Sequence, residues 1–297
     1  MRRMLVLGSV SLAGLLAITV MAQQAPPAFP PVSAPEKVAD NIYRIPGQGG
    51  NSAIFVRPDG VLLVDTKLAN NGPAILEQIR KVTDKPVTHV INTHTHGDHT
   101  GSNAFFAGAT VDFVAQENTK ANMQKMPDFK SGVGLPRETF KDRMTLFSGK
   151  DEVDLYYFGA AHTNGDAFVV FRNAHVMHAG DVFATKGAPI IDQANGGSGV
   201  AYPQTIAKAA ATIKNVDKVI TGHSDVMTWQ DFVDYGEFNR EVLEHAKSAK
   251  AAGQTPEQAA ASFKPQDKFK DFPMRSMFGG PEVNFKNIYN ELDKGAK

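Results

Sequence analysis

The sequence predicts a single α/β domain, and three observations lead to this prediction. Apolar residues make up 42% of the 297 residues and charged residues 21%, which is the balance of an ordinary globular protein. From residue 41 onward, short β-rich runs alternate with segments of helical spacing. No internal repeat or low-complexity segment interrupts this alternation. Disorder, collagen and coiled coil are therefore poor descriptions of the chain.

The first 22 residues predict a secretory signal peptide. Met1-Arg2-Arg3 is positively charged, Leu5–Val20 is an uncharged apolar run, and small residues up to Ala22 suit cleavage by a signal peptidase. A membrane anchor is the alternative, but a hydrocarbon core needs about 20 apolar residues and this run is shorter and interrupted by glycine and serine. We therefore expect a periplasmic or secreted protein with no stable membrane insertion after cleavage.

The remaining chain predicts a tether and one domain. Residues 23–39 contain five prolines and predict an extended tether, and residues 40–297 predict the domain with a helical C-terminal tail. A hairpin closed at Pro58-Asp59-Gly60 joins the first two strands. Strands are predicted at 51–56, 61–65, 87–92, 111–115, 154–158, 167–171, 174–177 and 218–220, and helices at 73–82, 116–126, 203–213 and 229–252. Residues 184–200 predict a flexible loop on the substrate side.

Net charge and cysteine content limit the classes of function that the chain can have. The chain has 31 basic and 31 acidic residues, so its neutral net charge gives no electrostatic reason to expect nucleic acid as a partner. A small-molecule substrate is the expectation, and the oligomeric state stays open. The absence of cysteine excludes disulfides, thiol catalysis and thiolate zinc sites. Any metal must therefore be held by histidine and carboxylate.

The strand at 87–92 runs into a cluster of ligand-capable residues. His94, His96, Asp98 and His99 lie within six residues, and neutral imidazole and carboxylate are both ligands that zinc accepts. In an extended chain the first three would project to one side and His99 to the other, which would serve two neighbouring ions. A solvated polar loop, or a helix N-terminus capped by Asp98, is the alternative interpretation.

Three later strands each deliver one further candidate ligand into a turn of small residues. These candidates are His162, Asp181 and His223. Together with the cluster they make five histidines and two aspartates, which is enough for two ions that share a bridging carboxylate.

The run from His94 to His99 resembles the HxHxDH signature of the metallo-β-lactamase superfamily, and the later candidates follow in the order of that family. The resemblance covers roughly residues 40–225 and implies an αββα sandwich with the metals at one edge. It implies one ion held by His94, His96 and His162, and another held by Asp98, His99 and His223, with Asp181 bridging. Asp65 falls where the family commonly has an aspartate, and we expect it to brace the site rather than to bind metal.

The resemblance implies a zinc-dependent metallohydrolase with two Zn²⁺ ions per chain, and the predicted signal peptide implies that it is exported. A zinc-bound water has a pKa near ~7, so a metal-bound hydroxide could hydrolyse an ester, thioester, lactone or related bond without a serine or cysteine nucleophile. Asp98 is the predicted catalytic residue, because it could both orient the hydroxide and carry a proton to the leaving group.

Three alternatives remain. A class B-like β-lactamase is disfavoured, because Asp181 stands where some β-lactamases of this fold place a cysteine and the others usually lack a bridging aspartate. An iron-dependent persulfide dioxygenase on the same fold would need one iron, held by His94, His96, His162 and Asp181. A metal-binding but inactive module is the third. His89, His175 and His245 are interpreted as packed or surface residues, and His178 as a residue that could contact the site.

Overall fold

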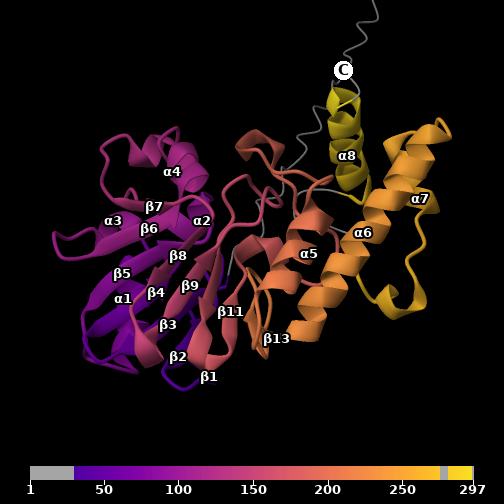
Figure 1. Cartoon of the computed structure of the whole chain (residues 1–297). Coiled ribbons are helices and arrows are strands. Elements are labelled where there is room, and N and C mark those ends of the chain that lie inside the picture. Colours follow the sequence, from indigo (N-terminus) through magenta and orange to yellow (C-terminus); the bar gives the residue numbers. More distant parts are fainter. Residues whose placement is uncertain (1–29, 275–279, 296–297) are drawn as a thin grey trace, which may run out of the picture.

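The computed structural model describes residues 30–274 and 280–295 and forms four layers, in which helices cover the outer faces of two packed β-sheets (Figure 1). This arrangement confirms the predicted αββα sandwich. The predicted signal peptide and the first part of the predicted tether, residues 23–29, lie outside the described residues. No helix within the described ranges is both long and apolar enough to cross a membrane.

The first sheet has seven strands in sequence order. They are β1 (Glu36–Ala39), β2 (Ile42–Ile45), β3 (Ser52–Arg57), β4 (Gly60–Val64), β5 (Val87–Asn92), β6 (Asp112–Gln116) and β7 (Glu138–Phe140). The predicted hairpin is confirmed, since β3 and β4 pair antiparallel with Arg57 opposite Gly60. The predicted end of the tether is wrong. Glu36–Ala39 forms a strand because Val38, 4% exposed, is buried between the two sheets.

The second sheet has six strands, of which β11 and β12 are parallel neighbours. Their order is β13 (Met227–Thr228), β12 (Lys218–Ile220), β11 (Val176–His178), β10 (Phe168–Phe171), β9 (Val153–Tyr156) and β8 (Arg143–Leu146). The sequence did not predict β7 or β8. Both are short, β7 has one buried residue and β8 has none, so neither carries a strong apolar pattern.

Each sheet is buried on both faces. In β4, Leu62 and Val64 face the core between the sheets, whereas Val61 and Leu63 face the core beneath the outer helices. All four are fully buried. Burying each such side chain contributes about 1.5–3 kcal/mol, so this continuous apolar strand stabilises the cores on both faces of the first sheet.

Helices complete the two outer layers (Figure 1). On the side of the first sheet lie α1 (Gly72–Arg80), α2 (Gly97–Thr100), α3 (Asn103–Phe106) and α4 (Glu117–Met123), and on the side of the second lie α5 (Tyr202–Thr212), α6 (Trp229–Ala251), α7 (Pro256–Ser262) and α8 (Glu282–Gly295). The 3₁₀ turns are η1 (Pro127–Phe129), η2 (Gly149–Asp151), η3 (Arg172–Ala174), η4 (Gly180–Phe183), η5 (Gln193–Asn195) and η6 (Asp267–Phe269). The helix predicted at 116–126 ends at Met123, shortly before Pro127 starts a 3₁₀ turn.

The candidate ligands gather at one end of the sandwich. Parallel pairing of β4 with β5, and of β11 with β12, brings the carboxyl ends of neighbouring strands to the same edge of each sheet. Asp65 follows β4, His94 follows β5, Asp181 follows β11 and His223 follows β12. Because the two sheets pack face to face, both edges contribute to one cluster.

Candidate metal centre

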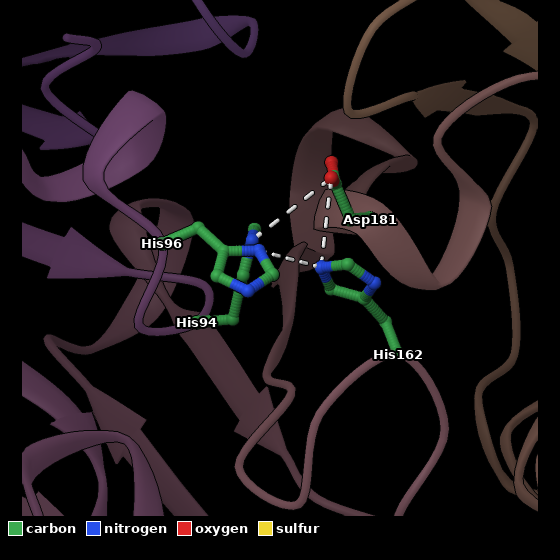
Figure 2. A group of neighbouring side chains, drawn as sticks. All are labelled: His94, His96, His162 and Asp181. Atoms are coloured by element: carbon green, nitrogen blue, oxygen red, sulfur yellow. Dashed lines mark hydrogen bonds and ion pairs between the residues drawn. The ribbon is translucent and has the colours of Figure 1, made fainter. Parts of the chain in front are cut away.

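The seven candidate ligands form two neighbouring groups. His94, His96, His162 and Asp181 make the first group and Asp98, His99 and His223 the second, and within each group the donor atoms lie within 4.8 Å of one another. Figure 2 shows the four side chains of the first group converging from opposite sides of the cluster. The histidines and Asp98 are divided as the resemblance implies, and Asp181, which the resemblance places between the two ions, lies with the first group.

Asp181 connects the two groups. One of its oxygens, Oδ2, lies 3.6 Å from His162 Nε2 and 3.9 Å from His94 Nε2 in the first group. The same oxygen is 3.2 Å from His223 Nε2, and Oδ1 is 3.2 Å from His99 Nε2, in the second. A carboxylate in this position is placed to bridge two ions.

The loop that follows β5 is not extended along its whole length, and this corrects one prediction. Gly97–Thr100 forms a helical turn, with His96 in an extended conformation just before it. The turn carries Asp98 away from His94 and His96 and places its Oδ2 3.3 Å from His223 Nε2. The prediction that Asp98 projects to the same side as His94 and His96 is therefore wrong.

Asp65 holds one imidazole from each group. Its Oδ2 accepts hydrogen bonds from His99 Nδ1 and from Thr93 Oγ1, both at 2.7 Å. Thr93 Oγ1 in turn lies 3.0 Å from His94 Nδ1. Because an ionised carboxylate only accepts, His99 must carry its proton on Nδ1, which leaves Nε2 free to bind metal. Asp65 thus has the bracing position expected for it.

The segment at residues 184–200, which follows η4, positions the other two imidazoles of the first group, those of His96 and His162. Asp192 Oδ2 lies 2.7 Å from His96 Nε2, and the carbonyl oxygen of Ile190 lies 2.8 Å from His162 Nδ1. The opposite ring nitrogens, His96 Nδ1 and His162 Nε2, face each other at 2.9 Å. Sequence reasoning missed Asp192, because no local pattern links it to a histidine 96 residues earlier.

The same segment is anchored to the last helix by Glu291 of α8. Glu291 Oε1 accepts a hydrogen bond from Gly199 N at 2.7 Å, and Oε2 accepts one from Ser198 Oγ at 2.5 Å. A second link runs from Gln193 Nε2 to the carbonyl oxygen of Asn287 at 2.9 Å. Residues 184–200, which the sequence predicts to be a flexible loop, are therefore hydrogen-bonded to α8. These bonds help to hold the segment that contacts His96 and His162.

Burial and neighbouring charges set the protonation of the histidines. Burial lowers the pKa of His162 to about 4, so its imidazole is neutral at pH 7, the form that binds metal. Burial would also lower the pKa of His223, but the carboxylates of Asp181 and Asp98 raise it to about 9. In the described part of the chain the ion-pair partners of Asp98 and Asp181 are histidines and not lysine or arginine. Both carboxylates are thus available to neutralise a cation.

The donor set fits metal ions. His94 Nε2 is buried in the cluster without a hydrogen-bond partner, which is costly unless a ligand satisfies it. Glycine backbone also approaches the donors closely. A Cβ atom at Gly222 would lie 1.9 Å from Asp181 Oδ1, and one at Gly50 would lie 2.1 Å from the His99 ring.

Lys67, which the sequence did not single out, lies beneath the second group. It is fully buried, and its Nζ donates hydrogen bonds to the carbonyl oxygens of Ile45 at 2.7 Å and Gly50 at 2.8 Å. Burial lowers the pKa of Lys67 to about 7. Since Gly50 packs directly against the His99 ring, Lys67 fixes the backbone on which that ring rests.

The other histidines lie outside the two groups. His89 packs on Phe147, His245 packs on Phe263 and Phe285, and His175 occupies a left-handed turn. His178 is fully buried, with Nε2 3.0 Å from the carbonyl oxygen of Asn51, and its Nδ1 accepts from Gly180 N at 3.1 Å. Its hydrogen bonds therefore support the backbone next to Asp181 and do not involve the seven candidates.

Comparisons with known proteins agree with this geometry. The family model of the metallo-beta-lactamase superfamily matches residues 45–223. The type 2 metallo-beta-lactamase of Bacteroides fragilis is 24% identical over 245 residues, which cover 78% of this chain and 91% of that protein.

Two solved structures show the same fold at low identity. DIM-1 metallo-beta-lactamase has a TM-score of 0.60 and 17% identity, with 71% of this chain and 98% of that chain covered. The inverting sec-alkylsulfatase Pisa1 from Pseudomonas sp. has a TM-score of 0.73 and 14% identity over 87% of this chain. The present chain spans 50% of the length of that alkylsulfatase.

Proposed function

Since this chain belongs to the metallo-β-lactamase superfamily of hydrolases, we propose that it is an exported zinc hydrolase acting on an ester, thioester, lactone or related bond. The observation that carries the proposal is the position of Asp181, which is grouped with three imidazoles and also lies 3.2 Å from both His99 and His223. A shared carboxylate suits two ions about which a substrate carbonyl and a water molecule can be arranged.

The residues of the chain have separate tasks in this proposal. Bound zinc ions would lower the pKa of a coordinated water toward about 7 and would polarise the bond to be cleaved. Asp65 and Asp192 fix the orientation of the imidazoles. Asp98, whose side chain is 21% exposed, lies between the cluster and solvent, so it can hold a proton and pass it to a leaving group.

Export is part of the proposal. It is supported by the charged start, apolar run and small residues of the first 22 residues. The absence of cysteine also suits an oxidising compartment.

A β-lactam substrate is the second candidate, favoured by the 24% identity to the Bacteroides fragilis protein. The aspartate at position 181, where some β-lactamases of this fold have cysteine, argues against it. A single-iron dioxygenase is the third, because the first group alone offers three histidines and one carboxylate.

The test is elemental analysis of protein purified without added metal, followed by assays on esters, thioesters, lactones and β-lactams. We expect about two zinc ions per chain, with hydrolysis lost on chelation and restored by zinc. One iron per chain, little zinc, and oxygen consumption with persulfides would overturn the hydrolase proposal. Turnover of β-lactams with no activity on the other substrates would select the second candidate.

A further inference from the structure

A pocket of about 280 Å³ opens beside the first ligand group. Its base is His96, one wall is the segment at residues 189–192, and the opposite wall is the first two turns of α8. The lining residues are His96, Pro189, Ile190, Ile191, Asp192, Val283, Asn284 and Asn287. Since His96 is a candidate ligand, a molecule in this pocket would contact one residue of the first ligand group.

The lining is mainly apolar and contains no lysine or arginine. Its one carboxylate, Asp192, is already engaged, because it accepts hydrogen bonds from His96 Nε2 at 2.7 Å and from Asn195 Nδ2 at 2.6 Å. A sulfate, phosphate or carboxylate would find no cation here and would meet the negative charge of Asp192. An uncharged aliphatic group, in contrast, would bury apolar surface against Pro189, Ile191 and Val283.

One polar atom of the lining lacks a partner. Asn284 is 2% exposed, and its Nδ2 makes no hydrogen bond. A buried amide donor left unpaired is costly, and such groups in binding sites commonly serve a ligand. Asn284 lies in the first turn of α8, where the positive end of the helix dipole also favours an acceptor oxygen.

We propose that this pocket binds the aliphatic acyl group of an uncharged ester or lactone, and that the Asn284 amide turns toward the pocket and donates a hydrogen bond to an oxygen of that substrate. The inference rests on the proposed hydrolase function and names its substrate class. The family model ends at residue 223, so the α8 wall lies outside the matched region. Glu291 and Gln193 hold the two walls together.

The first test is a series of p-nitrophenyl esters from acetate to octanoate, assayed with the zinc-loaded protein. Burial of one methylene is worth about two- to fourfold in kcat/KM, so the value should rise by this factor at each added methylene until the pocket is full. Val283→Trp should fill the pocket and abolish the rise. The control is Val233→Trp, which alters a half-buried helical valine in a separate groove between α5 and α6 and should keep the rise.

The second test separates the hydrogen bond from the fold. Asn284→Leu removes an unpaired buried donor, so the thermal midpoint should stay equal or rise, whereas kcat/KM should fall by about three- to tenfold for every chain length. A fall in thermal midpoint together with unchanged kcat/KM would show that Asn284 serves the fold and not the substrate.

Failure of the pocket inference and failure of the hydrolase proposal give different results. Ester hydrolysis with no dependence on chain length, or with equal dependence in Val283→Trp, would overturn the pocket inference alone. If no ester, thioester or lactone is hydrolysed, calorimetric titration with hexanamide tests whether the pocket binds an uncharged acyl group at all. Binding by the wild type that is lost in Val283→Trp supports the pocket without the proposed reaction, and no binding by the wild type overturns both.

Discussion

Replacing Asp65 by asparagine should weaken metal binding at the second group by reversing one hydrogen bond. Asp65 Oδ2 receives two donors, His99 Nδ1 and Thr93 Oγ1, each at 2.7 Å. An asparagine Nδ2 in that place would present hydrogens to both. His99 can relieve the conflict only by moving its proton from Nδ1 to Nε2, which is the nitrogen that faces Asp181 and the second group.

The size of the effect follows from this change of tautomer. Removing the partner that orients a liganding imidazole typically costs about 10- to 100-fold in metal affinity. This corresponds to about 1.4–2.7 kcal/mol of binding free energy. Thr93 Oγ1 donates to Asp65 and also contacts His94 Nδ1, so the change at Asp65 reaches His94 as well. We therefore also expect a smaller loss of metal affinity at the first group.

The assay is titration of metal-free protein with zinc against a competing chelator, with both dissociation constants fitted. Asp154→Asn is the matched control. Asp154 is 2% exposed and accepts hydrogen bonds from Thr145 Oγ1 at 2.6 Å and Arg143 at 3.0 Å, so the control should lower stability and leave zinc affinity unchanged. Wild-type affinity at both sites in Asp65→Asn would refute the orienting role assigned to Asp65.

Three further predictions follow from the site. Asp98→Asn should lower kcat by at least about 100-fold at saturating zinc, and a wild-type rate would remove its assigned role in proton transfer. Gly222→Ala should lower zinc content measured after dialysis against buffered zinc, because its Cβ would lie 1.9 Å from Asp181 Oδ1; Gly97→Ala is the control, since a Cβ there meets nothing within 4 Å. Burial lowers the pKa of Lys67 to about 7, so from pH 7 to the ordinary value of 10.5 the unfolded chain binds a proton that the folded chain does not. The free energy of unfolding of the metal-free wild type, measured with urea, should therefore rise over this range by up to about 1.4 kcal/mol per pH unit more than that of Lys67→Met; equal slopes would contradict it.

Local patterns predicted the parts of the fold that local forces determine. The Pro58-Asp59-Gly60 turn and the apolar run of β4 were both predicted within a residue, because turn chemistry and continuous burial leave strong marks in the sequence. The candidate ligands could also be recognised, since they lie in the loops and turns that follow strands. The helical turn at Gly97–Thr100 was missed because four residues carry no helical period.

Contacts between distant segments could not be predicted in the same way. Asp192 meets His96 and Glu291 meets Gly199 only because the second sheet places α8 over the end of the sandwich. Neither residue lies in an apolar period or a motif. Lys67 was equally hidden, because a buried lysine that donates to two carbonyls has the same sequence signature as an exposed one.

The first ligand group draws its members from both halves of the sandwich, and this has a consequence for the whole molecule. His94 and His96 follow a strand of the first sheet, whereas His162 and Asp181 belong to the second. An ion held by all four would act as a crosslink between the two halves. A higher metal concentration should then raise the thermal midpoint of unfolding. Chelation should weaken the contact between the two sheets as well as stop the reaction.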